Sequence, residues 1–478
     1  MAGAEIALAH DYATQRGGAE RVALMMAGAF PGAPMFTTLH HPEGTFPEFG
    51  RLDLRTTGLN QFRALRRSHR LALPLLARAV DRTPIDAELV LASSTGWAHG
   101  FPVTGRKVVY CHAPARWLYQ GERYLGRDGG AKQWAMARAL GVLAPGLRDW
   151  DRRAAATADR YLANSTVTAR AVREVYGIEA EVLPPPPAML PASPELAPPG
   201  VEPGFLLCVA RLLPYKNVDV VIEAVRRTPG ARLVVVGDGP ARAALAQRVA
   251  DLPRVLLAGR VDDPQLRWLY RNCAALVAAS YEDYGLSPLE AAAFGRPSVV
   301  LRDGGYLDTV RDRVTGEFFD SPVAEDVAEA IDRTLTRRWD ADLLRAHAET
   351  FGLPRFVARL HAVADAELGR TPRPDPCRRR SAGPRTPRGD AMTLQEMLRT
   401  IWFGKWLVLV SLVAAGAGAW FYVSGQEPPL RGGGHRAHRR CGDPGGGRGP
   451  GGGGPQPGHL RPGRRCRGRP AGWRRGRA

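Results

Sequence analysis

The chain has little cysteine and no cysteine pattern that would bind a metal or build a disulfide framework. Only six of its 478 residues are cysteine, and no two of them form a C-x-x-C pair. Frameworks held by zinc or disulfides need cysteines at close, repeated spacings. No Asp-x-Asp follows a strand-like run, and Gly237-Asp238-Gly239 does not complete a dinucleotide-binding fingerprint. We therefore expect reduced thiols, as in the cytoplasm, and find no metal-site signature.

Most of the chain also lacks an excess of either charge. The formal net charge is +19, but residues 371–478 hold 21 Lys and Arg against 5 Asp and Glu, which leaves 45 against 42 for residues 1–370. Nucleic-acid-binding domains carry a clustered basic excess, so we expect no specific nucleic-acid partner for residues 1–370. The sequence opens on a strand-like run at 6–9, without a basic segment and a long apolar one, so we also expect no signal peptide.

What the chain does have is a regular alternation of short apolar runs and longer amphipathic segments. In residues 1–183 the strand-like runs lie at 6–9, 89–92, 107–111 and 161–164, and a helix opens at Gly17-Gly18. Ser165 is suited to cap the helix after the last of these runs. Strands that alternate with helices indicate a parallel sheet covered on both faces. Residues 1–183 are therefore predicted to form an α/β domain.

A second α/β domain is predicted for residues 205–352. It follows residues 184–204, which include four consecutive prolines and have the composition of a linker. The strand-like runs of the second domain lie at 205–210, 233–236, 255–258, 274–279 and 298–301. Ligands of such domains bind beyond the carboxyl ends of the strands, so the residues just after each run are the candidates for a site.

The character of the sequence changes after residue 369. Residues 370–391 are rich in Pro, Arg and Asp, and residues 431–478 in Gly, Arg and Pro, so both are predicted to be disordered. Residues 392–430 between them contain an apolar run at about 402–423, with aromatic residues near its ends. About 20 apolar residues can span a membrane, so a single transmembrane helix is predicted here, with a buried soluble helix as the alternative.

The segment that begins at Met392 resembles the start of a bacterial polysaccharide chain-length determinant. Met392-Thr393-Leu394-Gln395 looks like a fresh protein start, and the domain expected after the first span of such a protein is missing. Two neighbouring genes joined by a frameshift, with a second frameshift after the span, would explain both observations. A genuine fusion with a basic tail is the alternative, and resequencing the gene would separate the two.

The most informative stretch is Glu282–Glu290, in which two carboxylates bracket a glycine-containing turn and the start of a helix. It lies between the strand-like runs 274–279 and 298–301. Carboxylates placed in this way can accept hydrogen bonds from two sets of hydroxyls, and the helix N-terminus can hold an anion. The alternative for Glu290 is a capping box with Ser287, in which Pro288 would take the first helical position.

This stretch resembles the E-x7-E donor-sugar motif of the retaining glycosyltransferases of family 4. Other segments resemble the same family in the expected order: His10-Asp11-Tyr12 with Gly17-Gly18-Ala19-Glu20-Arg21, Tyr110-Cys111-His112-Ala113-Pro114, Ala163-Asn164-Ser165, residues 209–217, residues 237–240, Gly304-Gly305 and Thr315-Gly316. The resemblance covers about residues 4–369. The opening segments are most similar to the branch that includes bacterial mannosyltransferases of surface-polysaccharide assembly.

The resemblance implies a GT-B fold, in which two Rossmann-like domains face each other across a cleft and a helix over residues 353–369 packs back on the first domain. It also implies transfer with retention of configuration, with the departing phosphate helping to deprotonate the acceptor. No metal and no cofactor besides the nucleotide-sugar donor are implied. Two residues depart mildly from the family pattern: Asp308 stands where glutamate is usual, and Tyr284 where phenylalanine is common.

The resemblance also assigns roles to single residues. Arg211 and Lys216 would bind the donor diphosphate, which gains negative charge as it leaves; solvated surface charge is the alternative for both. Glu282 would accept hydrogen bonds from the sugar hydroxyls, and Glu290 from the ribose. The amides of Gly285 and Leu286 would also contact the donor, as would the turns Gly17-Gly18 and Gly304-Gly305. His112 would contact the transferred sugar, and Asp11 would lie near the acceptor.

The acceptor is suggested by one basic amphipathic stretch, Phe62–Arg82, which holds six arginines and five leucines. Such a stretch can lie on anionic lipid, and an ordinary solvated helix face is the alternative. Lipid-linked acceptors would suit the first interpretation.

Together these patterns predict a hexosyltransferase on the cytoplasmic side of the cell membrane. It would transfer mannose from GDP-mannose to a lipid-linked or glycan acceptor in surface-polysaccharide biosynthesis, although no residue decides between guanine and uracil. Two alternatives remain open. One is an epimerase or phosphorylase on the same fold, and the other is a membrane-anchored scaffold or chain-length regulator with an inactive transferase domain.

Overall fold

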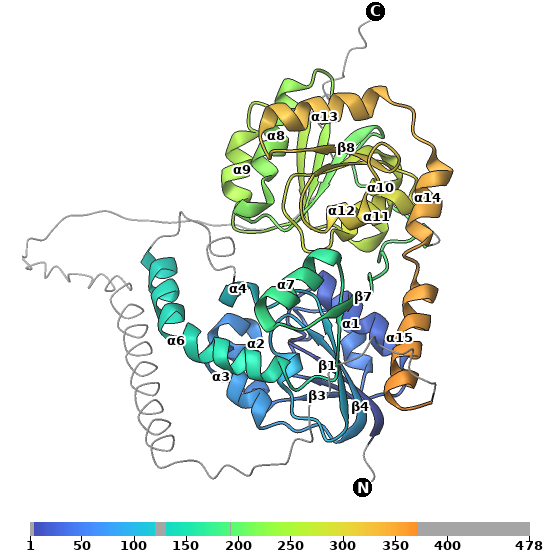
Figure 1. The fold of residues 1–478 in the computed structure, drawn as a ribbon. Helices are drawn as coiled ribbons and strands as arrows, with labels where there is room; N and C mark the ends of the chain where they lie inside the picture. Colours follow the sequence, from blue (N-terminus) through green and yellow to red (C-terminus); the bar gives the residue numbers. More distant parts are fainter. Residues whose placement is uncertain (1–3, 120–130, 192, 371–478) are drawn as a thin grey trace, which may run out of the picture. The chain divides into compact units, whose positions relative to one another are not determined.

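The computed structural model describes residues 4–119, 131–191 and 193–370, which are drawn as ribbons in Figure 1. The transmembrane helix predicted at about 402–423, the disorder predicted for residues 370–391 beyond Arg370, and the disorder predicted for residues 431–478 lie outside the described residues. Within the described ranges, no helix is both long enough and apolar enough to cross a membrane. All described residues fall within one compact unit, Met1–Arg378.

The first half of the described chain forms a sheet of seven parallel strands in the order β3-β2-β1-β4-β5-β6-β7. The strands are β1 (Ala4–His10), β2 (Met35–Thr37), β3 (Leu54–Thr56), β4 (Ala87–Ser94), β5 (Arg106–Cys111), β6 (Arg160–Ala163) and β7 (Ala180–Val182). The helices are α1 (Gly18–Ala29), α2 (Arg63–Arg67), α3 (His69–Asp81), α4 (Arg116–Tyr119), α6 (Ala131–Ala155) and α7 (Thr166–Tyr176). Ser165 caps α7, as predicted, and accepts a hydrogen bond from the Thr168 amide.

The second half forms a sheet of six parallel strands in the order β10-β9-β8-β11-β12-β13. The strands are β8 (Phe205–Val209), β9 (Leu233–Val236), β10 (Val255–Gly259), β11 (Cys273–Ala278), β12 (Ser298–Leu301) and β13 (Gly316–Phe319). The helices are α8 (Val218–Arg227), α9 (Arg242–Arg248), α10 (Asp263–Asn272), α11 (Leu286–Ala293), α12 (Tyr306–Thr309), α13 (Ala324–Thr336) and α14 (Ala341–Glu349). Two parallel sheets of this kind confirm the predicted pair of Rossmann-like domains.

Each sheet has one point at which the order of its strands reverses. The reversal lies between β1 and β4 in the first sheet, and between β8 and β11 in the second. At such a point the loops after the two neighbouring strands diverge to opposite faces and leave room for a ligand between them. The loops after β1, β4, β8 and β11 are therefore the ones that topology places at a site.

The last helix of the described chain, α15 (Leu353–Glu367), returns to the first sheet. Its side chains Phe356 and Leu360 belong to the same buried cluster as Leu91 of β4 and Val108 of β5. Figure 1 shows α15 beside α1. Arg106 of β5 also donates to the buried Glu367 carboxylate at 3.1 Å. The helix expected at 353–369 thus covers the first sheet, as the resemblance implies.

Candidate active site

Lys216 and Glu282 meet at the reversal point of the second sheet. Lys216 ends the short turn after β8 (Pro214–Lys216), and Glu282 follows β11. The Lys216 Nζ donates to Glu282 Oε1, which also accepts from Ser280 Oγ at 2.7 Å. Asn217, in the left-handed region at φ 51°, fixes the turn by donating to the Ala279 carbonyl at 2.8 Å. Two residues that are 66 positions apart in sequence therefore form one ion pair.

The ion pair keeps both groups charged although both are largely buried. Burial by itself would raise the pKa of Glu282. The Lys216 ammonium lowers this pKa by more, so it lies below its ordinary value. Burial lowers the pKa of Lys216, but the Glu282 carboxylate raises it, so that it lies above its ordinary value. Arg211, in contrast, is exposed and forms no ion pair with any residue of the described ranges. The site therefore holds a fixed ammonium and one guanidinium open to a ligand.

The capping box that was the alternative for Glu290 is not present. Helix α11 begins at Leu286, one residue after Gly285 in the left-handed region at φ 87°, so Pro288 is the third helical residue and not the first. Glycine sets this start because a Cβ at Gly285 would lie 2.5 Å from the Tyr306 ring. The Glu290 carboxylate instead accepts from the Tyr270 hydroxyl at 2.7 Å, and burial raises its pKa.

The two predicted glycine turns allow close approach of backbone. A Cβ at Gly304 would lie 2.3 Å from the Glu282 carbonyl, and the Gly305 amide donates to that same carbonyl at 2.7 Å. In the first sheet, a Cβ at Gly18 would lie 3.2 Å from the Leu286 side chain. The first turns of α1 and α11, one from each sheet, therefore face each other across a short distance.

His112 follows β5 and is held inside the first sheet. Its Nε2 lies 2.9 Å from Ser93 Oγ, and Ser93 Oγ also lies 3.1 Å from Nδ1 of His10. Burial, together with the charges of His10 and Arg116, lowers the pKa of His112 to about 3. The imidazole is therefore neutral near pH 7, and its predicted contact with a transferred sugar would be a neutral hydrogen bond.

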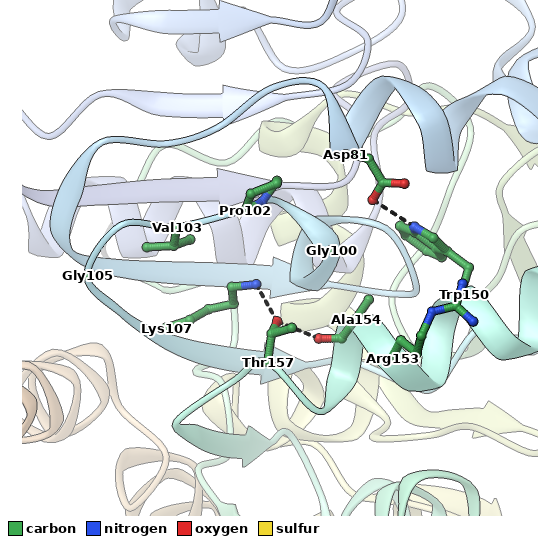
Figure 2. Close-up of a pocket in the computed structure, with 10 residues that line it drawn as sticks. All are labelled: Asp81, Gly100, Pro102, Val103, Gly105, Lys107, Trp150, Arg153, Ala154 and Thr157. Carbon is green, nitrogen blue, oxygen red and sulfur yellow. Dashed lines mark hydrogen bonds between the residues drawn. The ribbon is translucent and has the colours of Figure 1, made fainter. Parts of the chain in front are cut away.

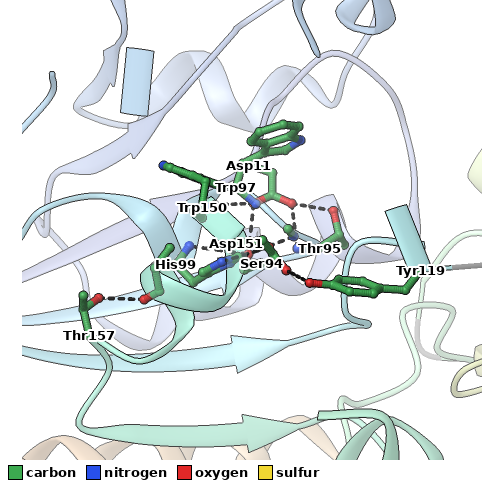
Figure 3. Close-up of polar contacts among 12 residues, drawn as sticks. Asp11, Ser94, Thr95, Trp97, His99, Tyr119, Trp150, Asp151 and Thr157 are labelled. Carbon is green, nitrogen blue, oxygen red and sulfur yellow. Dashed lines mark hydrogen bonds and ion pairs between the residues drawn. The ribbon is translucent and has the colours of Figure 1, made fainter. Parts of the chain in front are cut away.

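Asp11 is buried, and both of its carboxylate oxygens are occupied (Figure 3). One oxygen accepts from the amides of Trp97 and Ala98 at 3.1 and 2.6 Å, and the other from the Thr95 amide at 2.6 Å and the Thr95 hydroxyl. The loop after β4 is thus fixed to the first residue after β1, at the reversal point of the first sheet. The acceptor role of Asp11 remains a prediction. In the structure its carboxylate holds the loop after β4 in place at this edge of the first sheet.

A chain of buried polar side chains continues from Asp11 (Figure 3). Ser94 Oγ donates to Asp11 and lies 3.0 Å from Nδ1 of His99, whose Nε2 lies 3.2 Å from Asp151. Tyr119 of α4 donates to the other Asp151 oxygen at 2.8 Å. The order Ser–His–Asp resembles a nucleophilic triad. The Ser94 hydroxyl already donates its hydrogen to Asp11 and not to His99, so the chain does not form a nucleophilic triad. It instead holds α4 to α6 and to the β4 loop.

The sequence gives no signal for the polar contacts that join the two sheets. Arg116, the first residue of α4, forms an ion pair with Asp283, and Ser165 Oγ donates to the Asp283 carbonyl. Of the two residues that depart from the family pattern, Asp308 also bonds to the first domain, and Tyr284 bonds to the linker between the domains. The Asp308 carboxylate accepts from the amide and hydroxyl of Thr166, both at 2.7 Å, and Tyr284 donates to the Pro185 carbonyl at 2.8 Å.

A cavity of about 450 Å³ lies elsewhere, at the amino end of β5 (Figure 2). At its floor the buried Lys107 donates to the His99 carbonyl at 2.9 Å and to Thr157 Oγ1 at 2.7 Å, and burial lowers the pKa of Lys107 to about 8. None of the predicted site residues lines this cavity. Among the described residues, no three His, Cys, Asp or Glu side chains are grouped to hold a metal.

Part of the chain is similar to known glycosyltransferases. Residues 197–350 match the family model of glycosyl transferases group 1. The D-inositol 3-phosphate glycosyltransferase of Nocardiopsis dassonvillei is 33% identical over 234 residues, which are 42% of this chain and 54% of that protein. The enzyme of the same name from Mycolicibacterium smegmatis is 34% identical over 188 residues, 36% of this chain and 43% of that protein. The chain thus spans about half the length of these curated relatives.

Solved structures show the same fold. Anabaena Alr3699/HepE in complex with UDP-glucose is 19% identical, with a TM-score of 0.54, and the match covers 76% of this chain and 99% of that one. The lipopolysaccharide outer core galactosyltransferase WaaB is 16% identical, with a TM-score of 0.52, covering 77% and 99%. At this identity the likeness establishes the GT-B fold and nothing finer.

Proposed function

We propose that this chain is a retaining glycosyltransferase that transfers a hexose from a nucleotide sugar to a lipid-linked or glycan acceptor. The observation that carries the proposal is the Lys216–Glu282 pair at the reversal point of the second sheet, beside the start of α11. It lies within the residues that match group 1 glycosyl transferases. A cation next to a helix N-terminus suits a diphosphate, and a carboxylate beside it suits sugar hydroxyls.

In the proposed reaction the bond between the anomeric carbon and the donor phosphate breaks, and a bond from the acceptor oxygen forms on the same face. The acceptor proton passes to the departing phosphate oxygen. Lys216 and Arg211 stabilise the negative charge that develops on the diphosphate. The neighbouring carboxylates are engaged, Glu282 with Lys216 and Asp283 with Arg116, which supports a reaction without a protein nucleophile.

For the donor we propose GDP-mannose, and a UDP-sugar is the alternative because the Anabaena neighbour was solved with UDP-glucose. Calorimetric titration of the full-length chain with GDP-mannose, UDP-glucose and UDP-N-acetylglucosamine tests this choice. We expect one of them to bind and Lys216→Ala and Glu290→Ala to lose about 30-fold or more in affinity, since truncation of a buried charge partner costs about 2 kcal/mol or more.

Lys107→Ala is the matched control for that titration, because Lys107 is also a buried lysine but lies by the cavity at the amino end of β5. Its donor affinity should stay within about threefold of the wild type. If a folded wild-type chain bound none of the three sugars, the proposal would fail, and an inactive scaffold would be favoured. Turnover to a longer glycan, and not to an epimer or a sugar phosphate, separates a transferase from the other enzymes on this fold.

For the acceptor side we propose docking on an anionic membrane through α2 and α3, which would place the chain at the cytoplasmic face. Phe62, Leu71 and Leu75 are 60%, 57% and 38% exposed, and Leu71, Leu75 and Arg78 fall on one face of α3. Exposed apolar side chains among arginines fit the boundary between lipid headgroups and acyl chains. The opposite face of α3 packs into the first core through Ala72, Leu76 and Val80.

A vesicle experiment checks the docking surface. A chain ended at Arg370 should sediment with vesicles of phosphatidylglycerol and phosphatidylcholine, and not with phosphatidylcholine alone. Phe62→Ser with Leu71→Ser should weaken this binding about tenfold or more, because each buried side chain contributes about 1.5 kcal/mol or more. Leu343→Ser on α14 is the control, since Leu343 is also 56% exposed but lies on the second sheet. If the Leu343→Ser control lost as much vesicle binding as the double variant, α2 and α3 would be an ordinary solvent-exposed face and not a membrane-docking surface.

A further inference from the structure

Glu20, in the first turn of α1, has a buried carboxyl with one oxygen left unpaired. The residue is only 2% exposed, and its Oε2 has no hydrogen-bond partner in the described part of the chain. The side chain folds back over the amino end of its own helix, because a Cβ placed on Gly17 would lie 2.5 Å from Oε2. Buried oxygens are nearly always paired, so an unpaired one at a helix N-terminus points to an absent partner.

The groups around Glu20 come from three segments. Gln15 donates a hydrogen bond to it from the loop after β1, Asp11 adds negative charge from the end of β1, and Arg211 adds positive charge from the loop after β8 of the other sheet. Burial is the largest influence and raises the pKa of Glu20 to about 7, against the hydrogen bond from the amide of Glu20 itself, the hydrogen bond from Gln15 and the Arg211 charge. Near neutral pH this carboxyl is therefore present in both its protonated and its ionised form.

The position of Glu20 is where the proposed function places the donor diphosphate. The start of α1 faces the start of α11 through Gly18 and Leu286, and Arg211 is close enough to act on Glu20. An ionised carboxylate here would repel a diphosphate, whereas a protonated one could donate a hydrogen bond to a phosphate oxygen. Only the protonated state of Glu20 is therefore compatible with a diphosphate at the start of α1.

We propose that Glu20 binds the donor diphosphate as a neutral acid, donating its Oε2 hydrogen to a phosphate oxygen, so that donor binding in mildly alkaline solution takes up one proton from solvent. The inference rests on the proposed function and adds to it a specific ligand and a pH dependence. Glu282 and Lys216, whose pKa values are moved below and above their ordinary values, do not titrate near neutral pH. Burial also raises the pKa of Glu290, so the Glu20→Gln variant decides which carboxyl takes up the proton.

The test is calorimetry of the full-length chain with GDP-mannose, or with whichever nucleotide sugar binds in the titration above. A nucleotide sugar is used because its diphosphate, unlike that of a free nucleoside diphosphate, does not titrate between pH 6 and 8. Titrations in two buffers of different ionisation enthalpy give the number of protons taken up. With a pKa of about 7 in the free chain, linkage gives about 0.9 proton at pH 8 and about 0.1 at pH 6, with about tenfold weaker binding at pH 8.

Glu20→Gln is the informative variant, because the amide donates a hydrogen bond and cannot ionise. We expect it to take up no proton, to bind equally at pH 6 and 8, and to bind about tenfold more tightly than the wild type at pH 8. Glu317→Gln changes another buried glutamate, paired with Arg337 at 3.0 Å on the second sheet, and should keep the wild-type pH profile.

Absence of proton uptake by the wild type at pH 8, or an unchanged pH dependence in Glu20→Gln, would overturn the inference while leaving donor binding intact. Absence of any donor binding at pH 6, where Glu20 already carries its proton, would instead overturn the proposed function and the inference together. The wild-type measurement alone decides the matter if the variant fails to fold.

Discussion

Replacement of Glu282 by glutamine is expected to reduce kcat/KM for sugar transfer by about 100-fold to 1,000-fold. Two interactions are lost at once, because the carboxylate is both the proposed acceptor for the sugar hydroxyls and the partner of Lys216. Breaking a largely buried charge pair by removing one partner costs about 3–5 kcal/mol, and the expected range of rates corresponds to about 3–4 kcal/mol of this falling on the transition state. Steady-state transfer assays at saturating acceptor measure the change.

The same replacement should also weaken the positive charge that the diphosphate needs. Burial lowers the pKa of Lys216, and the carboxylate of Glu282 is what raises it again. Without that carboxylate, part of the Lys216 population loses its proton at alkaline pH, so the defect should deepen as the pH rises. In the wild type the folded pKa of Glu282 lies below its unfolded value, so the stability from the pair is present at neutral pH and is lost only in acid.

Glu317→Gln separates loss of activity from loss of stability. Glu317 of β13 is a buried carboxylate between Arg333 and Arg337, at 3.5 and 3.0 Å, and it lies away from the loops after β8 and β11. Its replacement should lower the melting temperature as much as that of Glu282 does, while kcat/KM stays within about threefold. Equal losses of activity in the two variants would mean that Glu282 acts only on the stability of the fold.

Much of the fold could be predicted from sequence because long apolar runs mark the central strands. The runs at 89–92 and 233–236 correspond to β4 and β9, which are buried on both faces. The edge strands β3 and β7 have only three residues each, and their residues are partly or wholly exposed. Three residues are too few to show a hydrophobic period, so such strands cannot be predicted from sequence. They are identified only by the neighbouring strand with which they pair.

Part of the candidate site could also be predicted from sequence, and part could not. Charged residues directly after a strand, such as Lys216 and Glu282, can be predicted because topology alone brings the loops after β8 and β11 together. The start of α11 could not be predicted, because a capping pattern at Ser287 and a left-handed glycine at Gly285 compete only two residues apart. Only the packing of Gly285 against Tyr306 decides between them. Glu20 stands within a recognised segment, but its unpaired oxygen depends on burial, which no local pattern encodes.

Contacts between the sheets leave no trace in sequence spacing, and the pair of Arg116 and Asp283 is the clearest case. The Asp283 side chain is 8% exposed and that of Arg116 is 36% exposed, and the pair lies one residue from Glu282. Burial raises the pKa of Asp283, and the Arg116 charge opposes that rise. The charge of Arg116 also acts on both Glu282 and Lys216. Arg116 is therefore expected to be a positioning residue that sets the Glu282 loop against the first sheet.

Reversal of this pair gives the second large effect. Arg116→Asp and Asp283→Arg should each reduce kcat about 100-fold, because each places like charges together next to the proposed donor site. Donor affinity should fall less than kcat in Arg116→Asp, since Lys216, Glu282 and Glu290 all belong to the second sheet and keep their positions. The double variant should recover at least about tenfold over the slower single variant, as a double-mutant cycle requires of two groups in direct contact.

The pair of Arg21 and Asp263 provides the matched comparison. It also joins the first sheet to the second, at 3.2 Å, but its side chains are 27% and 49% exposed. Exposed ion pairs contribute about 0–1 kcal/mol, so Asp263→Asn should change kcat by less than about threefold. If the reversed double variant were as slow as the slower single variant, the Arg116 charge would not act through Asp283. The closeness of Glu282 to the first sheet would then have to depend on Ser165 and Thr166, which also bond across the two sheets.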